Sequence, residues 1–336
     1  MPLLPDGRLD MALNVYGIPH AMGLMPTKAG APNPRPMTVT DFLDLAVELR
    51  LSAVDMELPR PDQMTDDAFA DALRERGLRL VVEHMYLLES DVPALRAALG
   101  RAGRLGARVF RACMSRVLCG DRRGLAGGWD AHFAATAARL RELLPAAHDL
   151  GLSIAVENHQ DCGSDDLLRL WDLTGQHPAY GVTLDAGNPL AVGEGPVEFA
   201  RRTAHLIRHV HCKDYTIHFS PEGYRLVRCA AGSGCVPFPE VLRVVLANGH
   251  GVLPGIEIAA QPTRTIPLLD DAWWACHGPR QKDHLVEALR VLWAHGVPAH
   301  VPYSSAWERG EDSATVAAEE LDVLRRSVAY FRSIAG

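Results

Sequence analysis

Four short apolar runs in this sequence each end in a side chain that can bind a metal ion. The ends are Glu157, Asp185, His211 and Glu257, in the stretches VENH, TLD, HVH and GIE. Each run follows a turn signal, which is typical of a buried strand. Carboxylate and imidazole ligands without a thiolate favour Mn²⁺, Mg²⁺ or Co²⁺ over a structural zinc ion. We therefore expect a divalent cofactor, with Mn²⁺ first.

Strand geometry extends this candidate site. Residues i and i+2 of a strand face the same side, so His209 points with His211, and His159 points with Glu157. Lys213 continues the His209 face beyond the strand. A cluster of this kind in a dry barrel mouth is costly unless a cation and hydrogen bonds compensate it.

The elements that must position these residues follow a regular βαβ rhythm, which predicts a parallel α/β barrel. The expected strands cover residues 12–16, 53–58, 78–82, 107–111, 153–157, 181–185, 207–211 and 253–257. The expected helices between them cover residues 40–49 with Thr40 as the cap, 66–76, 91–105, 129–150, 164–173, 197–206 and 239–248.

We predict one domain over residues 1–336, a (β/α)8 TIM barrel with a C-terminal helical extension. The barrel core takes about residues 12–260, and the extension about residues 265–336. Helices near 283–295 and 313–334 lie in this tail; one of them must cover the eighth strand, and the pattern does not say which. Trp273 and Trp274 could stack on a sugar, but packing of the tail is the favoured interpretation.

Bulk properties exclude several classes of protein. The net charge is −7 and the charges are interspersed, whereas a nucleic-acid-binding protein needs a basic face. No apolar stretch approaches the ~20 residues of a membrane span, and no secretory signal is visible. Seven cysteines without a CxxC pair indicate reduced thiols, so we expect a cytoplasmic protein.

The same motifs, VENH at 156–159, LDAGN at 184–188, HVHCKD at 209–214 and IE at 256–257, resemble the xylose isomerase-like TIM-barrel superfamily. Its members include ketose 3-epimerases, hydroxypyruvate isomerase and inosose dehydratase. The resemblance covers roughly residues 12–260. It implies that the metal ligands are Glu157, Asp185, His211 and Glu257, and that Arg228, before a Gly-x-Gly turn, contacts substrate.

The sequence departs from the superfamily pattern at two positions, and the first departure weakens an epimerase assignment. Asn188 stands where ketose 3-epimerases have a histidine, and Ser233 stands where the turn has an acid. The remaining residues that we expect to contact substrate are Arg111, His209, Lys213, Asn188 and Glu83. Glu57, His84, Arg111 and Glu83 could instead be ion pairs that buttress the rim.

The leading hypothesis is a sugar isomerase or epimerase that removes a proton next to a metal-chelated carbonyl and passes through an enolate. Glu157 and Glu257 would then act as the two bases. The alternative is a lyase using the same chemistry, either dehydration or cleavage of a 3-keto C-glycoside, with His159 as base. An endonuclease IV-type barrel and a non-catalytic sugar-binding barrel are less favoured.

These hypotheses share their expected partners. The substrate is a small carbohydrate, the chain forms a homo-oligomer, and neither nucleic acid nor membrane is bound. A small partner subunit is expected only if the chain is a C-glycoside deglycosidase.

Overall fold

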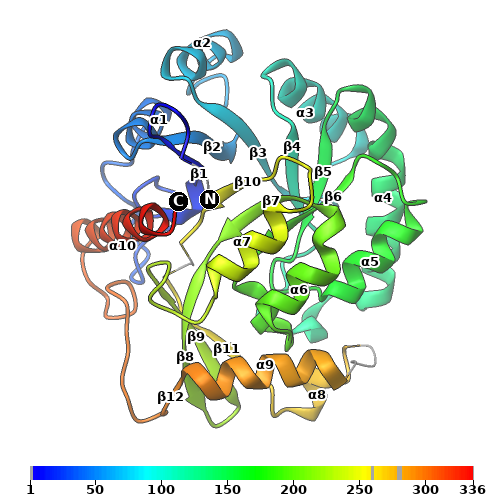
Figure 1. The fold of residues 1–336 in the computed structure, drawn as a ribbon, viewed down its shortest axis with the longest axis vertical. Coiled ribbons are helices and arrows are strands. Elements are labelled where there is room, and N and C mark those ends of the chain that lie inside the picture. Colours follow the sequence, from blue (N-terminus) through cyan, green and yellow to red (C-terminus); the bar gives the residue numbers. More distant parts are fainter. Residues whose placement is uncertain (1–2, 259–260, 278–281, 336) are drawn as a thin grey trace.

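The centre of the structure is a closed barrel of eight parallel strands (Figure 1). The computed structural model describes residues 3–258, 261–277 and 282–335. Around the barrel the strand order is β1-β10-β7-β6-β5-β4-β3-β2, so β10 closes the sheet against β1. The strands are β1 Leu9–Asn14, β2 Leu51–Glu57, β3 Arg79–Tyr86, β4 Val109–Cys113, β5 Ser153–Glu157, β6 Tyr180–Asp185, β7 Ile207–Cys212 and β10 Leu253–Ile256. The predicted TIM barrel with a C-terminal helical extension is confirmed.

Helices cover the outside of the barrel because each follows a strand and packs its apolar stripe onto the sheet (Figure 1). They are α1 Val39–Glu48, α2 Asp66–Arg76, α3 Val92–Arg104, α4 Trp129–Asp149, α5 Ser164–Leu173, α6 Pro196–Thr203 and α7 Phe238–Leu246. Short 3₁₀ helices occupy Val15–Gly17, Arg122–Gly124, Asn188–Val192 and Ala204–Leu206.

The helix ends follow from local capping chemistry. Thr65 accepts a hydrogen bond from the Ala68 amide before α2, and Gly77 ends that helix with φ of 59°. The cap of helix α1 lies two residues earlier than predicted. Thr38, not Thr40, is its cap, because Thr38 and Asp41 accept hydrogen bonds from each other's backbone amides.

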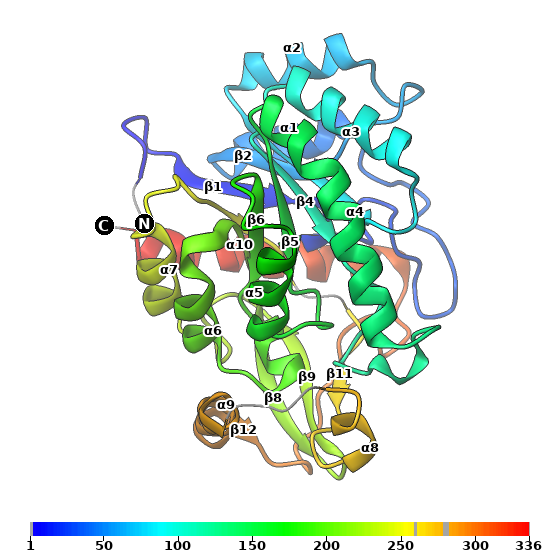
Figure 2. The ribbon, with the colours of Figure 1, turned by 90° about the vertical axis from the view of Figure 1, so that its right-hand side faces the viewer.

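A second, four-stranded sheet extends from the carboxyl end of β7 (Figure 2). Its order is β11-β9-β8-β12, with β8 Asp214–Ser220, β9 Gly223–Cys229, β11 Arg264–Ile266 and β12 Gly296–Val297. The sequence analysis assigned no strand or helix to residues 215–229. This segment forms an antiparallel hairpin whose alternating polar and apolar residues lacked the continuous apolar run of a barrel strand.

The two long tail helices have different positions. Helix α10 (Ser313–Ser333) packs against β10, so it is the helix that covers the last barrel strand. The Glu320 carboxylate holds it there by accepting hydrogen bonds from the amides of His20 (3.1 Å) and Ala21 (2.9 Å). Helix α9 (Lys282–His295) instead contacts α6, β8 and β12 (Figure 2).

The tryptophan pair belongs to the packing of the tail. Helix α8 (Asp271–Trp274) buries Trp273 completely, and its Nε1 donates to the Cys119 carbonyl at 2.9 Å. Trp274 Nε1 donates to the Leu268 carbonyl at 2.7 Å. Both indole N–H groups are therefore used in packing the C-terminal extension, as the sequence analysis favoured.

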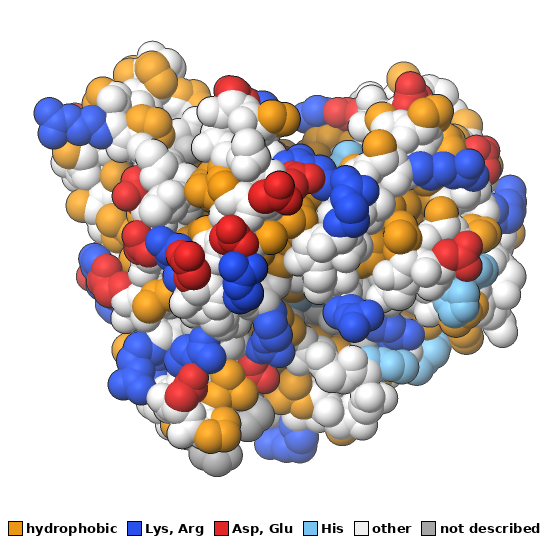
Figure 3. Space-filling model, turned by 90° about the horizontal axis from the view of Figure 1, so that it is seen from above, with side chains coloured by type: hydrophobic (Ala, Val, Ile, Leu, Met, Phe, Trp, Pro, Cys, Tyr) orange, Lys and Arg blue, Asp and Glu red, His pale blue; other side chains and the backbone are white. Residues whose placement is uncertain are grey.

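Acidic and basic side chains are interspersed over the face in Figure 3. Within the described ranges, no helix is long and apolar enough to cross a membrane. All seven cysteines are free thiols.

Candidate metal centre and adjoining cavity

The carboxyl ends of four barrel strands bring the four predicted ligands together. One ligand atom from each of Glu157, Asp185, His211 and Glu257 lies within 4.8 Å of the others. Register explains the convergence: Asp185 pairs with His211 across β6 and β7, and His211 pairs with Gly255, two residues before Glu257. All four are buried, Glu257 being the most exposed at 7%.

The His211 ring is held so that its two nitrogens face different groups. Nδ1 lies 2.7 Å from Glu257 Oε2 and 3.6 Å from Glu157 Oε1. Nε2 lies 3.1 Å from Asp55 Oδ2 and 3.2 Å from Glu83 Oε1. A ring with Nε2–H toward Asp55 leaves the Nδ1 lone pair directed into the cluster.

Two atoms of the cluster fit a bound cation. His211 Nδ1 and Glu157 Oε1 are buried and have no hydrogen-bond partner, although carboxylate oxygens surround the nitrogen. Buried polar atoms are normally hydrogen-bonded, and exceptions need a cause. Three carboxylates and one imidazole form a donor set that suits a hard or borderline divalent ion. The residues present therefore fit the metal that the sequence predicted.

Two buried cations balance the acids. Arg111 contacts Glu83 Oε2 at 2.6 Å and also contacts Glu157, while Lys213 Nζ lies 2.5 Å from Asp185 Oδ2 and 2.6 Å from Glu257 Oε1.

These environments separate the pKa values of the carboxyls. Burial raises the pKa of Asp185 to about 7 although Lys213 opposes it. Burial would also raise the pKa of Glu257, but Lys213 and His211 lower it to about 2. Burial and the neighbouring Asp55 charge raise the pKa of Glu83 to about 8, even with Arg111 beside it.

A second buried group lies one layer deeper in the barrel, centred on Asp55. Its Oδ2 accepts from Asn14 Nδ2 at 2.7 Å and lies 2.8 Å from His209 Nε2. His209 Nδ1 contacts the Leu253 carbonyl at 2.6 Å, so this ring is fixed inside the barrel. Sequence reasoning missed Asp55 and Asn14. The available signal was an acid in the middle of the apolar run AVDM at 53–56.

A cavity of about 220 Å³ adjoins the cluster. It is smaller than the roughly 300–1,000 Å³ of a typical ligand pocket, and therefore suits a small substrate. Four predicted site residues line it, namely Glu257, His159, Lys213 and Arg111; the other lining residues are Tyr16, Pro19, Leu24, Met25, Met85, Leu118, Gln160, Tyr215 and Arg264. Arg264 is a cation that the sequence analysis did not single out.

His159 is the neutral group of this cavity. Burial, aided by the charges of Arg111 and Lys213, lowers the pKa of its imidazole to about 4. Its Nδ1 is buried and has no hydrogen-bond partner. The preceding Asn158 fixes the backbone here, since its side chain bonds both the amide of Asp185 (2.7 Å) and its carbonyl (3.0 Å).

Other predicted substrate contacts lie outside the lining of this cavity. Asn188 Nδ2 donates to Asp185 Oδ2 at 2.6 Å and so steadies a cluster residue.

Arg228 is 2% exposed, and its three guanidinium nitrogens have no hydrogen-bond partner. Burial lowers the pKa of Arg228, while the negative charges of Glu320 and Glu319 in α10 act in the opposite direction and raise it. The Gly-x-Gly turn after Arg228 is held by Asp214, whose carboxylate accepts from the amides of residues 232, 234 and 236.

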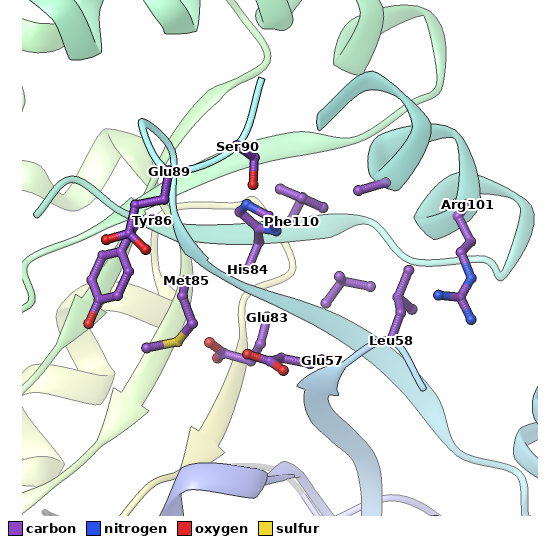
Figure 4. A pocket seen from close by; sticks show the side chains of 12 residues that line it. Glu57, Leu58, Glu83, His84, Met85, Tyr86, Glu89, Ser90, Arg101 and Phe110 are labelled. Atoms are coloured by element: carbon purple, nitrogen blue, oxygen red, sulfur yellow. The ribbon is translucent and has the colours of Figure 1, made fainter. Parts of the chain in front are cut away.

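The rim residues Glu57, His84 and Glu83 line a separate hollow of about 340 Å³ beside β3 (Figure 4). Glu57 accepts a hydrogen bond from the Tyr16 hydroxyl at 2.7 Å. The phenol thereby connects this rim to the cavity beside the cluster.

Residues 43–292 match the sequence profile of the family described as "Xylose isomerase-like TIM barrel". The chain belongs to this family.

Two curated relatives match part of the chain. The first is an inosose dehydratase from Clostridium botulinum, 27% identical over 143 residues, which are 38% of this chain and 48% of the relative. The second is a 3-oxo-isoapionate decarboxylase from Pectobacterium atrosepticum, 26% identical over 145 residues, 40% of this chain and 51% of the relative. The chain thus spans about half the length of the curated relatives it matches.

A similar solved structure is a xylose isomerase-like TIM-barrel protein from Mycobacterium smegmatis in complex with magnesium. It has a TM-score of 0.54 and 19% identity, and the match covers 85% of this chain and 97% of that one. At this identity the likeness shows the shared fold.

Proposed function

We propose that the protein is a divalent-metal-dependent lyase that acts on a small keto sugar, by removing a proton next to the carbonyl and expelling a leaving group from the next carbon. Glu157, Asp185, His211 and Glu257 would hold the ion. When bound, that ion supplies positive charge that stabilises the enolate developing on the substrate. The match to a dehydratase and a decarboxylase supports an enzyme of this general kind.

The surroundings of His159 are our reason for proposing a lyase instead of an epimerase. Its unpartnered Nδ1 belongs to a residue that lines the cavity, so an imidazole lone pair is available to accept a proton. Epimerisation needs a second base on the opposite face of the sugar. Of the two acids expected to act as bases, Glu157 is not among the cavity-lining residues and is engaged by Arg111. Glu257 lines the cavity, but its two oxygens are engaged by His211 and Lys213. The sequence analysis favoured epimerisation with a lyase as the alternative; the surroundings of His159 support our proposal of the lyase.

The chain's own residues would divide the work as follows. His159 takes the proton from the carbon, and the electron pair of the broken C–H bond forms the new double bond as the β C–O bond breaks. The leaving oxygen takes its proton from a nearby donor. Lys213 would be this donor, since it lines the same cavity. Arg111 keeps Glu157 ionised and in place. In a dehydration the sum of the step is an unsaturated ketone and one water.

Product analysis tests this proposal. The Mn²⁺-loaded protein is incubated with an inosose and a panel of keto sugars in deuterium oxide, and the products are weighed by mass spectrometry. A product lighter by one water, or two fragments, is expected. An isomer with unchanged skeleton that carries deuterium at the carbon next to the carbonyl would instead establish epimerisation and refute the lyase.

A further inference from the structure

Three cationic side chains line the cavity beside the cluster, and only two of them have acidic partners. Arg111 is held by Glu83 and Glu157, and Lys213 by Asp185 and Glu257. Arg264, the third, makes no ion pair with any described residue, and its Nε is buried without a hydrogen-bond partner. A partly buried guanidinium without a counter-ion is costly.

The position of Arg264 is set by β11. In this strand Arg264 lies opposite Leu226 of β9, while its neighbour Thr265 lies opposite Arg225. Because alternate residues of a strand face opposite sides, Arg264 and Arg225 lie on opposite faces of the same small sheet. Arg264 reaches the cavity, where Tyr215 of β8 also lies, and Arg225 donates to Thr263 instead.

The cavity lining therefore carries one cation without an acidic partner. The acids of the cluster are matched by Arg111 and Lys213 and would be matched further by a divalent ion. Arg264 adds a positive charge that is in no ion pair with a described residue. A planar guanidinium offers paired donors that suit a carboxylate or phosphate.

We propose that the substrate is an anionic keto sugar, whose carboxylate or phosphate group binds Arg264 while its carbonyl end lies at the metal cluster. This inference rests on the proposed function, since it takes the cavity as the substrate site. It adds a substrate class, acidic sugars, and a residue, Arg264, that distinguishes them from neutral sugars.

Three probes with one carbon skeleton test this: D-fructose, D-fructuronate and D-fructose 6-phosphate, titrated calorimetrically into the Mn²⁺-loaded chain. At least one of the two anions should bind about tenfold or more tightly than D-fructose. Tighter binding of D-fructuronate would indicate that the site prefers a carboxylate, and tighter binding of D-fructose 6-phosphate that it prefers a phosphate. If neither anion has this advantage, or neither binds, the inference fails.

Variants assign the preference to the residue. Arg264→Met should remove the advantage of the anion and leave D-fructose affinity within about twofold, while Arg264→Lys should restore part of it. Arg225→Met, on the opposite face, is the matched control and should keep the preference. A preference that survives Arg264→Met would overturn the assignment.

Stability gives a readout independent of sugar binding. Because Arg264 has no acidic partner, Arg264→Met should melt at the same temperature as the wild type or higher. A lower melting temperature would indicate a structural role and count against the inference. The binding and melting measurements do not depend on turnover. A failed lyase assay would therefore refute the proposed function, while the preference for an anion would still be decided by the binding measurements.

Discussion

His211 Nε2 lies 3.1 Å from Asp55 Oδ2, on the other side of the ring from the Nδ1 atom that faces Glu257. The imidazole is thus placed between a carboxylate inside the barrel and the cluster at its mouth. Such a partner fixes the tautomer and direction of a metal-binding histidine.

Asp55→Asn should lower the affinity for Mn²⁺ by about 10–100-fold, because the ring loses the charge that orients it. Calorimetric titration of the chelator-treated protein measures this. Asp62→Asn is the control, since Asp62 is an exposed acid paired with Arg60. Equal Mn²⁺ affinity in Asp55→Asn and wild type would exclude a positioning role for Asp55.

His159→Gln should leave Mn²⁺ affinity unchanged and reduce kcat by about 10²–10⁴-fold, the usual effect of losing a general base. His159 lines the cavity but does not belong to the four-residue cluster. The matched control is His300→Gln at an exposed position. Retention of full turnover would remove His159 from the reaction, whereas loss of Mn²⁺ binding would show that it supports the metal.

Asp161 should make folding stability depend on pH. Burial raises the pKa of its carboxyl to about 6 even though Ser115 donates a hydrogen bond to it. The folded chain therefore binds this proton more tightly than the unfolded chain, so the contribution is complete below about pH 4 and is lost as pH rises through about 6. A shift of this size corresponds to roughly 2–3 kcal/mol.

Urea unfolding between pH 4 and pH 7.5 measures this effect. Asp161→Asn should lose that part of the pH dependence, while Asp62→Asn should follow the wild type. Identical pH profiles for wild type and Asp161→Asn would contradict the raised pKa.

Glu320→Ala should destabilise the protein by about 2–4 kcal/mol, because the amides of His20 and Ala21 would lose their buried acceptor. Glu320→Gln keeps an acceptor and should cost much less. Chemical denaturation compares both with Glu311→Ala, an exposed control. If alanine at position 320 cost no more than at position 311, this contact would not be what fastens α10 to the barrel.

The barrel could be predicted from the sequence because its local signals agree. β5 (Ser153–Glu157), α2 and α5 have the predicted bounds, since turn signals, apolar runs and caps coincide there. The hairpin of β8 and β9 could not be found in this way, because its strands mix polar and apolar residues and lack the apolar run of a barrel strand. The choice between α9 and α10 as the cover of β10 depends on contacts such as Glu320 with His20, which are 300 residues apart in sequence.

The candidate site divides in the same manner. Ligands at strand ends could be predicted because parallel strands place their carboxyl ends on one face. Asp55 could not be predicted as a site residue because it lies inside a strand and not at its end. Arg264 could not be predicted because it follows the last barrel strand and reaches the cavity only through β11. Arg228 and Asn188 carry suitable chemistry but are not among the residues that line the cavity, which sequence spacing does not reveal.

Four side chains distant in sequence, Glu157, Asp185, His211 and Glu257, should together hold one divalent ion. Titration of Mn²⁺ into the chelator-treated wild type and into Glu257→Gln tests it most directly, with Glu311→Gln as control. We predict one ion per wild-type chain and at least about 100-fold weaker binding in Glu257→Gln, since a charged ligand is lost. No stoichiometric binding by the wild type, or equal affinity in both proteins, would contradict the account.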